Sequence, residues 1–152
     1  MIRKLLFVCI HNSARSQMAE AWTRALCHGD WEAASAGLEP GTIHPLTVAV
    51  MLEKGIDLHG KPTRSVADVM TSGERFDFVV TVCDETSAEK CPLFPGTTQR
   101  LHWGFRDPSS AVGSQAEKLE VFRQVRDEIR DQIEQWCAAV CGASGELAEA
   151  AQ

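Results

Sequence analysis

The sequence lacks the features of several large classes of protein. Among its 152 residues no apolar run is long enough to span a membrane, and residues 5–10 are also too few for the core of a secretory signal. Positive charge is scarce, because 15 Lys and Arg stand against 21 Asp and Glu and leave a net charge of −6. This balance excludes a broad nucleic-acid-binding surface but allows a local basic pocket. We therefore expect a cytoplasmic protein that contacts neither membranes nor nucleic acid.

Internal repeats, low-complexity linkers and the glycine motifs of nucleotide-binding loops are also absent. Apolar residues make up 44% of the chain and charged residues 24%, which is typical of globular proteins. A chain of this size buries about two-thirds of its unfolded surface, so it can fold without disulfides or a metal. We expect a single domain over residues 1–141 and a frayed C-terminal tail over residues 142–152.

Six cysteines are present: Cys9, Cys27, Cys83, Cys91, Cys137 and Cys141. Since disulfides are rare in a reducing cytosol, we expect all six to be thiols. A metal site built from the last four is conceivable, but their spacing lacks the paired Cys-x2-Cys pattern of such sites. We therefore interpret Cys27, Cys137 and Cys141 as packing residues and expect no bound metal.

Buried strands alternate with helices along the chain. The patterns predict strands at 3–9, 31–36, 76–83 and 100–103, and helices at 16–28, 45–54, shortly after 65, and at 116–140. This alternation is typical of parallel strands joined by right-handed crossovers, which form a three-layer α/β domain. In such sheets, ligands bind at the carboxyl ends of the strands.

The first predicted strand ends at Cys9, and a helix follows almost at once. An oxyanion-binding loop is predicted there, made of Ile10, His11, Asn12, Ser13, Ala14, Arg15 and Ser16. Its backbone N–H groups and the helix N-terminus can surround a tetrahedral anion, and Arg15 can bind two of the anion's oxygens. The same surroundings stabilise Cys9 as a thiolate, with a hydrogen bond from Ser13 or Ser16. The alternative is that Cys9 only packs at a strand end.

A carboxylic acid, Asp107, stands before Pro108 late in the chain. Attack on an oxyanion expels an oxygen, which leaves more easily when a general acid protonates it. Asp107 is therefore a candidate for that acid, although Asp-Pro is also common in ordinary turns.

Together, Cys9-x5-Arg15-Ser16 and Asp107-Pro108 resemble the low-molecular-weight protein tyrosine phosphatase family over residues 1 to about 140. The resemblance implies a four-stranded parallel sheet flanked by helices. It also implies that Cys9 is the nucleophile, Arg15 the oxyanion-binding residue and Asp107 the general acid.

Three further segments resemble the thioredoxin-coupled arsenate reductases of this family: Val82-Cys83, Cys91-Pro92 and His102-Trp103-Gly104-Phe105. This resemblance implies a role in arsenic detoxification, in which Cys9 attacks arsenate and Cys83 resolves the adduct as a disulfide. Cys91 then carries the disulfide outward, and thioredoxin or a similar dithiol protein reduces it. It implies no bound cofactor, since thiols supply the electrons, and we expect a monomer. Taken alone, Cys83 and Cys91 would be interpreted as a packing thiol at a strand end and a loop thiol; the nearby anion loop favours the redox interpretation.

Two other functions remain open. A phosphatase acting on phosphotyrosine or aryl phosphates would need only Cys9, Arg15 and Asp107, and phosphate could compete with arsenate. Phosphatases of this fold usually carry an aromatic residue after Asp-Pro, whereas Ser109 and Ser110 follow here and the chain contains no tyrosine. This favours a small inorganic substrate. The third possibility is a thiol redox sensor or oxyanion-binding module without catalysis.

The sequence departs from the family pattern at a few positions. His11 replaces a usual loop glycine, and Ala14 replaces a common second loop cysteine. The segment between Cys83 and Cys91 is one residue longer than in the best-known arsenate reductases. Some relatives bind potassium through residues matching Asn12, Glu20 and Ser35. Because the fourth, acidic position is Arg64 here, we do not expect that ion.

Overall fold

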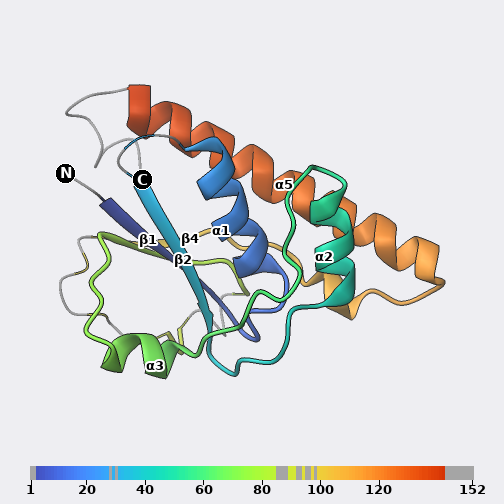
Figure 1. The fold of residues 1–152 in the computed structure, drawn as a ribbon, viewed down its shortest axis with the longest axis horizontal. Coiled ribbons are helices and arrows are strands. Elements are labelled where there is room, and N and C mark those ends of the chain that lie inside the picture. The colour runs from blue at the N-terminus through green and yellow to red at the C-terminus, as the bar shows by residue number, and fades with distance from the viewer. Residues whose placement is uncertain are drawn as a thin grey trace.

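The computed structural model describes residues 3–27, 29, 31–84, 89–91, 94, 97 and 99–142 (Figure 1). Its centre is a parallel sheet of four strands in the order β2-β1-β3-β4. The strands are β1 (Arg3–Cys9), β2 (Trp31–Gly37), β3 (Phe78–Thr81) and β4 (Gln99–His102). The helices are α1 (Arg15–Leu26), α2 (Pro45–Leu52), α3 (Val66–Thr71), the 3-10 helix η1 (Pro108–Ser110) and α5 (Gln115–Gly142).

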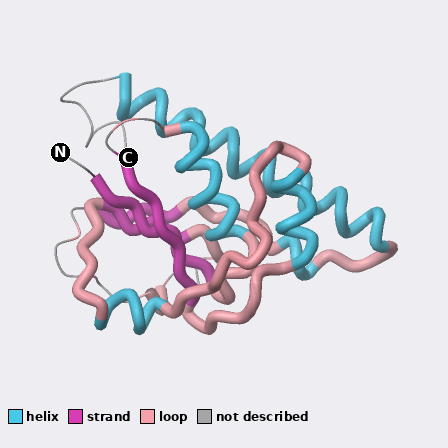
Figure 2. Tube along the Cα trace, in the orientation of Figure 1, coloured by secondary structure: helices cyan, strands magenta, loops and turns pink. Residues whose placement is uncertain are grey.

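Helices α1, α2 and α5 lie on one side of the sheet and α3 on the other, as Figures 1 and 2 show. The sheet separates two apolar clusters. Alternate residues of β1 point to opposite faces, so Leu5 and Phe7 pack with the buried faces of α1 and α5. Leu6 and Val8 belong to a smaller cluster on the other face, together with Val66 and Val69 of α3. The predicted three-layer α/β architecture with a four-stranded parallel sheet is confirmed.

The predicted elements are present, but several ends differ. The third strand pairs only over Phe78–Thr81, with both β1 and β4, not over 76–83. The helix predicted at 16–28 begins one residue earlier and ends at Leu26. The one predicted at 45–54 ends at Leu52, and the chain then turns at Gly55, whose φ is +80°. Helix α5 reaches Gly142, and the tail expected beyond it lies outside the described residues.

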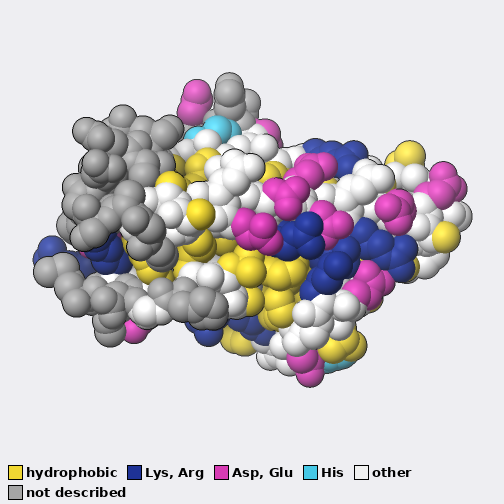
Figure 3. Space-filling view, turned by 90° about the horizontal axis from the view of Figure 1, so that it is seen from above, with side chains coloured by type: hydrophobic (Ala, Val, Ile, Leu, Met, Phe, Trp, Pro, Cys, Tyr) yellow, Lys and Arg dark blue, Asp and Glu magenta, His cyan; other side chains and the backbone are white. Residues whose placement is uncertain are grey.

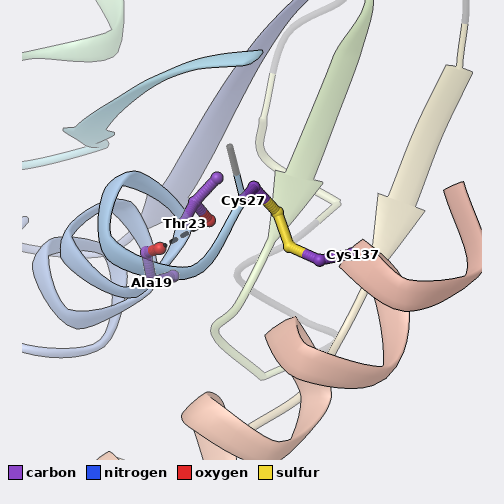
Figure 4. The surroundings of a disulfide bond; sticks show 4 residues. All are labelled: Ala19, Thr23, Cys27 and Cys137. Atoms are coloured by element: carbon purple, nitrogen blue, oxygen red, sulfur yellow. Dashed lines mark hydrogen bonds between the residues drawn. A yellow bond between two sulfur atoms is a disulfide. The ribbon is translucent and has the colours of Figure 1, made fainter. Parts of the chain in front are cut away.

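A disulfide joins Cys27 to Cys137, so the expectation that both are packing thiols is wrong (Figure 4). Cys27 directly follows α1, and Cys137 lies on the face of α5 that packs against α1 and the sheet. Their Cα atoms are 5.5 Å apart, which is within the normal range for a disulfide. The bond fastens the end of α1 to α5. Sequence spacing could not reveal it, because 110 positions separate the two residues.

The face shown in Figure 3 carries basic and acidic side chains interspersed with one another. Elsewhere in the fold, Glu53, which follows α2, pairs with both Arg123 and Arg126 of α5 at 2.8 Å. Among the described residues, none of the helices is both long and apolar enough to serve as a membrane span.

Candidate active site

The loop after β1 curls at the carboxyl edge of the sheet, where the sequence predicts an oxyanion site. The partner strand β2 places Gly37 beside Cys9. A Cβ at Gly37 would lie 2.8 Å from backbone atoms of Ile10, His11 and Asn12. Only glycine therefore lets the loop approach β2 this closely.

The Cys9 sulfur lies within reach of two hydrogen-bond donors. The backbone N–H of Asn12 donates to Sγ at 3.2 Å, and the Ser16 hydroxyl lies 2.8 Å from Sγ. Of the two serines the sequence left open, Ser16 makes this contact, whereas the Ser13 carbonyl accepts hydrogen bonds from the start of α2 and Thr47. Cys9 is 2% exposed, so water screens these interactions weakly.

Helix α1 directs its N-terminus at the loop. Its N-cap residue is Ala14, whose side chain accepts no hydrogen bond from the first turn. The first N–H groups of α1 are therefore not satisfied by a side-chain cap, which suits an anion bound in the loop.

The Arg15 side chain is buried and held at its tip. One terminal nitrogen donates to the Phe105 carbonyl at 3.0 Å, and the other lies 3.9 Å from the Asp107 carboxylate. The residues after β4 thus bring a backbone acceptor and a carboxylate to the same guanidinium. This contact joins the two distant parts of the candidate site.

Asp107 ends the loop after β4, as predicted, and caps η1. Its Oδ1 accepts hydrogen bonds from the Ser109 backbone N–H at 2.9 Å and the Ser109 hydroxyl at 2.6 Å. Burial pushes the pKa of Asp107 upward, but the Ser109 hydrogen bonds and the Arg15 charge outweigh burial and lower it. Asp107 is therefore ionised at neutral pH when the loop holds no anion. A bound oxyanion would add negative charge nearby and raise this pKa again.

Cys83 emerges at the same sheet edge as Cys9. The β1–β3 register continues as a hydrogen bond from the Val82 N–H to the Val8 carbonyl, and Cys83 is the next residue. Burial raises the pKa of the Cys83 thiol to about 11; the nearby Arg15 charge opposes this rise, and Cys9 adds to it. Both residues pack in the same apolar cluster, as expected for neighbouring parallel strands.

Cys91 lies on the other side of the sheet. It is 4% exposed and packs in the cluster that contains Leu6, Val8 and Val79. Burial raises the pKa of the Cys91 thiol. Arg100, which donates to the Cys91 carbonyl at 3.0 Å, opposes this rise without cancelling it. The structure therefore brings together Cys9, Arg15, Cys83 and Asp107, but it does not place Cys91 in their cluster. Residues 85–88, which precede Cys91, lie outside the described residues.

Other positions that the sequence analysis named make hydrogen bonds within the fold. The ring of His11 reaches the Glu39 carbonyl at 2.8 Å. The buried Glu20 carboxylate binds Ser35 at 2.6 Å and Lys61 at 2.9 Å. Over the described part of the chain, His, Cys, Asp and Glu side chains form no group of three that could hold a metal.

Several contributors to the site are absent from the sequence prediction. The Phe105 carbonyl, the Ser109 hydroxyl and the side chains of Gln17 and Lys61 each contact a site residue or its direct partner. Every residue has a backbone carbonyl, so the residue type of Phe105 does not indicate this contact. Gln17 follows Ser16 in an ordinary helical pattern, which gives no sign of its role. Only Ser109, next to Asp107-Pro108, carried a local signal as a possible partner of the carboxylate.

Known proteins match this chain over most of its length. The low molecular weight phosphotyrosine protein phosphatase family matches residues 4–144. An arsenate reductase of Oceanobacillus iheyensis is 40% identical over 88% of this chain and 94% of its own. A solved arsenate reductase in its oxidized state has a TM-score of 0.73 and 31% identity, over 90% of this chain and 98% of that one. A thioredoxin-dependent arsenate reductase of Corynebacterium glutamicum has a TM-score of 0.61 and 26% identity, over 86% of this chain and 60% of that one. The chain therefore belongs to the low molecular weight phosphotyrosine protein phosphatase family, in the branch that includes these arsenate reductases.

Proposed function

We propose that this protein is an arsenate reductase that converts arsenate to arsenite with its own thiols. The observation that carries the proposal is the position of Cys83, a second buried thiol at the sheet edge where Cys9 meets the oxyanion loop. Hydrolysis of a phosphate ester would need no such thiol. The named relatives of this chain support the same reading.

Substrate binding uses the loop and Arg15. An arsenate anion held by the backbone N–H groups of residues 10–16 faces the N-terminus of α1 and the free donors of the Arg15 guanidinium. Phosphate has the same shape and charge, so it competes for the loop.

The first chemical step forms a sulfur–arsenic bond. The Cys9 thiolate attacks As(V), and one arsenic–oxygen bond breaks. Asp107, whose pKa the bound anion raises, gives its proton to a hydroxyl group of the arsenate, which leaves as water. Arsenic keeps its oxidation state in this step.

The second step transfers two electrons to arsenic. The Cys83 thiolate attacks the Cys9 sulfur, the Cys9–Cys83 disulfide forms, and the electron pair of the sulfur–arsenic bond stays on arsenic as arsenite. The nearby Arg15 charge opposes the burial that raises the Cys83 pKa, so it favours the Cys83 thiolate that this step needs.

The last step regenerates Cys9. The Cys91 thiolate attacks the Cys83 sulfur, the Cys83–Cys91 disulfide forms, and Cys9 leaves as a thiolate. A dithiol protein, thioredoxin by analogy with the Corynebacterium glutamicum relative, reduces this disulfide. No bound cofactor takes part in the proposal, and we expect the protein to act as a monomer in the cytoplasm.

The deciding experiment measures two activities of the same preparation. Arsenite formation from arsenate is followed with thioredoxin, thioredoxin reductase and NADPH, beside hydrolysis of para-nitrophenyl phosphate. We expect arsenite turnover that stops when thioredoxin is omitted, with little aryl phosphate hydrolysis. Aryl phosphate turnover without arsenite formation would contradict the proposal and assign the protein as a phosphatase.

A further inference from the structure

Lys61 stands at the end of a chain of hydrogen bonds that leads to the nucleophile. The Lys61–Cys9 chain runs through Lys61, Gln17, Asn12, Ser16 and Cys9. We propose that Lys61 is a positioning residue, whose ammonium group sets the direction of this chain so that every link donates toward the Cys9 sulfur. The proposal rests on Cys9 as the nucleophile of the proposed function but not on the identity of its substrate.

At the sulfur end, Asn12 controls both donors. The Asn12 Nδ2 group donates to Ser16 Oγ at 2.8 Å, so the hydroxyl proton of Ser16 remains for the Cys9 sulfur. The backbone N–H of Asn12 is the second donor to that sulfur. Asn12 has a φ of +54° and is the only residue other than glycine with positive φ in the part of the chain that the structure describes. This conformation costs free energy, so the side-chain contacts of Asn12 must hold it.

In the middle of the chain, Gln17 holds Asn12. The Gln17 Nε2 group donates to Asn12 Oδ1 at 3.2 Å and to the Pro62 carbonyl at 3.3 Å. Both residues are fully buried, so water cannot replace these contacts. If the Gln17 amide turned over, its oxygen would face two acceptors. Asn12 Oδ1 would then keep only one of its two donors, the Arg64 backbone N–H at 3.0 Å.

Lys61 prevents that reversal. Its Nζ donates to Gln17 Oε1 at 2.6 Å, and an ammonium group has no acceptor, so only the oxygen of Gln17 can face it. The Nζ is held in turn by Glu20 Oε1 at 2.9 Å, and the Glu20 side chain is 3% exposed. The buried carboxylate thus fixes Lys61, and Lys61 fixes Gln17.

The direction of the chain favours the reactive form of Cys9. A thiolate accepts hydrogen bonds and donates none, whereas a thiol would compete as a donor. With every link donating toward the sulfur, the dipoles of the chain also align from a cation to the developing anion. Lys61 therefore acts on the nucleophile through Gln17, without touching the substrate.

The test is the rate at which iodoacetamide alkylates Cys9 at a fixed neutral pH, read by mass spectrometry of the Cys9 peptide. For Lys61→Met we expect alkylation to slow by roughly tenfold, the scale of one hydrogen bond to a charged group. The matched control is Arg24→Met. Arg24 also pairs with Glu20, at 3.1 Å, but it lies outside the chain, so its variant should alkylate at the wild-type rate. Equal slowing in both variants would assign the effect to the charge near Glu20 and overturn the proposal.

Gln17→Met is the second variant, because it breaks the chain while leaving the Lys61–Glu20 ion pair intact. We expect the same slowing, and the double variant Lys61→Met/Gln17→Met should alkylate no more slowly than Gln17→Met alone. Wild-type alkylation in folded Gln17→Met would overturn the proposal even if Lys61→Met failed to fold. Alkylation requires no arsenate, so the two outcomes can be told apart. If the variants alkylate slowly but the wild type does not reduce arsenate, the proposed function is contradicted and this inference is supported.

Discussion

The Arg15 guanidinium approaches the Asp107 carboxylate to 3.9 Å, whereas its other terminal nitrogen is bound to the Phe105 carbonyl at 3.0 Å. The carbonyl contact sets the orientation of the guanidinium, and the looser ion pair leaves donors for a bound anion. Arg15 thus connects the anion loop after β1 with the acid after β4.

Asp107→Asn should slow the formation of the Cys9 adduct but leave anion binding nearly intact. Removing a general acid typically reduces the rate by about 10²–10⁴-fold, because the departing oxygen then leaves without its proton. Single-turnover kinetics would measure this rate, and phosphate inhibition would measure binding. If Asp107→Asn formed the adduct at the wild-type single-turnover rate, Asp107 would not be the general acid.

Ser109→Ala should move the ionisation of Asp107 to higher pH. The Ser109 hydroxyl donates to the Asp107 carboxylate at 2.6 Å and lowers its pKa, so its loss must raise that pKa. The limb of the pH–rate profile that depends on Asp107 should shift to higher pH. Ser110→Ala is the matched control, since its hydroxyl lies 3.4 Å away and a smaller shift is expected. Equal shifts in both variants would argue against this assignment.

Cys83→Ser and Cys91→Ser should fail at different steps. Without Cys83, arsenite release should stop, while any aryl phosphate hydrolysis by Cys9 continues. Without Cys91, about one equivalent of arsenite should form before the enzyme stalls as Cys9–Cys83. The buried position of Cys91 across the sheet means that the second disulfide requires rearrangement, since the two Cα atoms must approach within about 7 Å.

Peptide mass spectrometry of arsenate-treated protein, alkylated without reductant, would identify these disulfides. Sustained arsenite turnover in Cys91→Ser would exclude the second exchange. Thiols alone at positions 83 and 91 of the treated wild-type protein would contradict the whole thiol sequence.

Cys137→Ser should lower the free energy of unfolding by about 2–5 kcal/mol, the usual contribution of a disulfide that closes a long loop. Urea unfolding, with and without dithiothreitol, would measure it. Reductant should destabilise the wild type to the level of the variant and leave the variant itself unchanged. Cys27→Ser is the matched control and should give the same loss, with no addition in the double variant. Insensitivity of the wild type to reductant would contradict a stabilising disulfide.

Glu53 should contribute stability that is lost in acid. A hydrogen bond from Arg123 is the main cause that lowers the pKa of Glu53 from 4.5 to about 2; burial opposes this shift, and Arg126 adds to it. Because the folded-state pKa is the lower one, the contribution is complete above about pH 4.5 and disappears as the pH falls through about 2. The difference in unfolding free energy between wild type and Glu53→Gln should follow this course. A difference that is constant from pH 6 to pH 2 would show that Glu53 acts without its charge.

The sequence by itself determined the framework of the site. Contiguous apolar residues specify the buried strands β1 and β3, because a strand covered on both faces must be apolar throughout. The helix that follows Cys9 within a few residues specifies an anion-binding loop, since strand, loop and helix N-terminus are neighbours in the chain. Cys9, Arg15 and the edge position of Cys83 could therefore be predicted.

The tertiary structure decided the contacts between distant segments. The Cys27–Cys137 disulfide, the position of Cys91 across the sheet and the approach of Lys61 to Gln17 depend on how α1, α5 and the loops pack. Hydrophobic periodicity shows which face of an element is buried, but it does not show which residues of another element meet that face. Side-chain hydrogen bonds are more specific still, because a shift of about one ångström breaks them. For this reason the chain from Lys61 to the Cys9 sulfur is visible only in the folded protein.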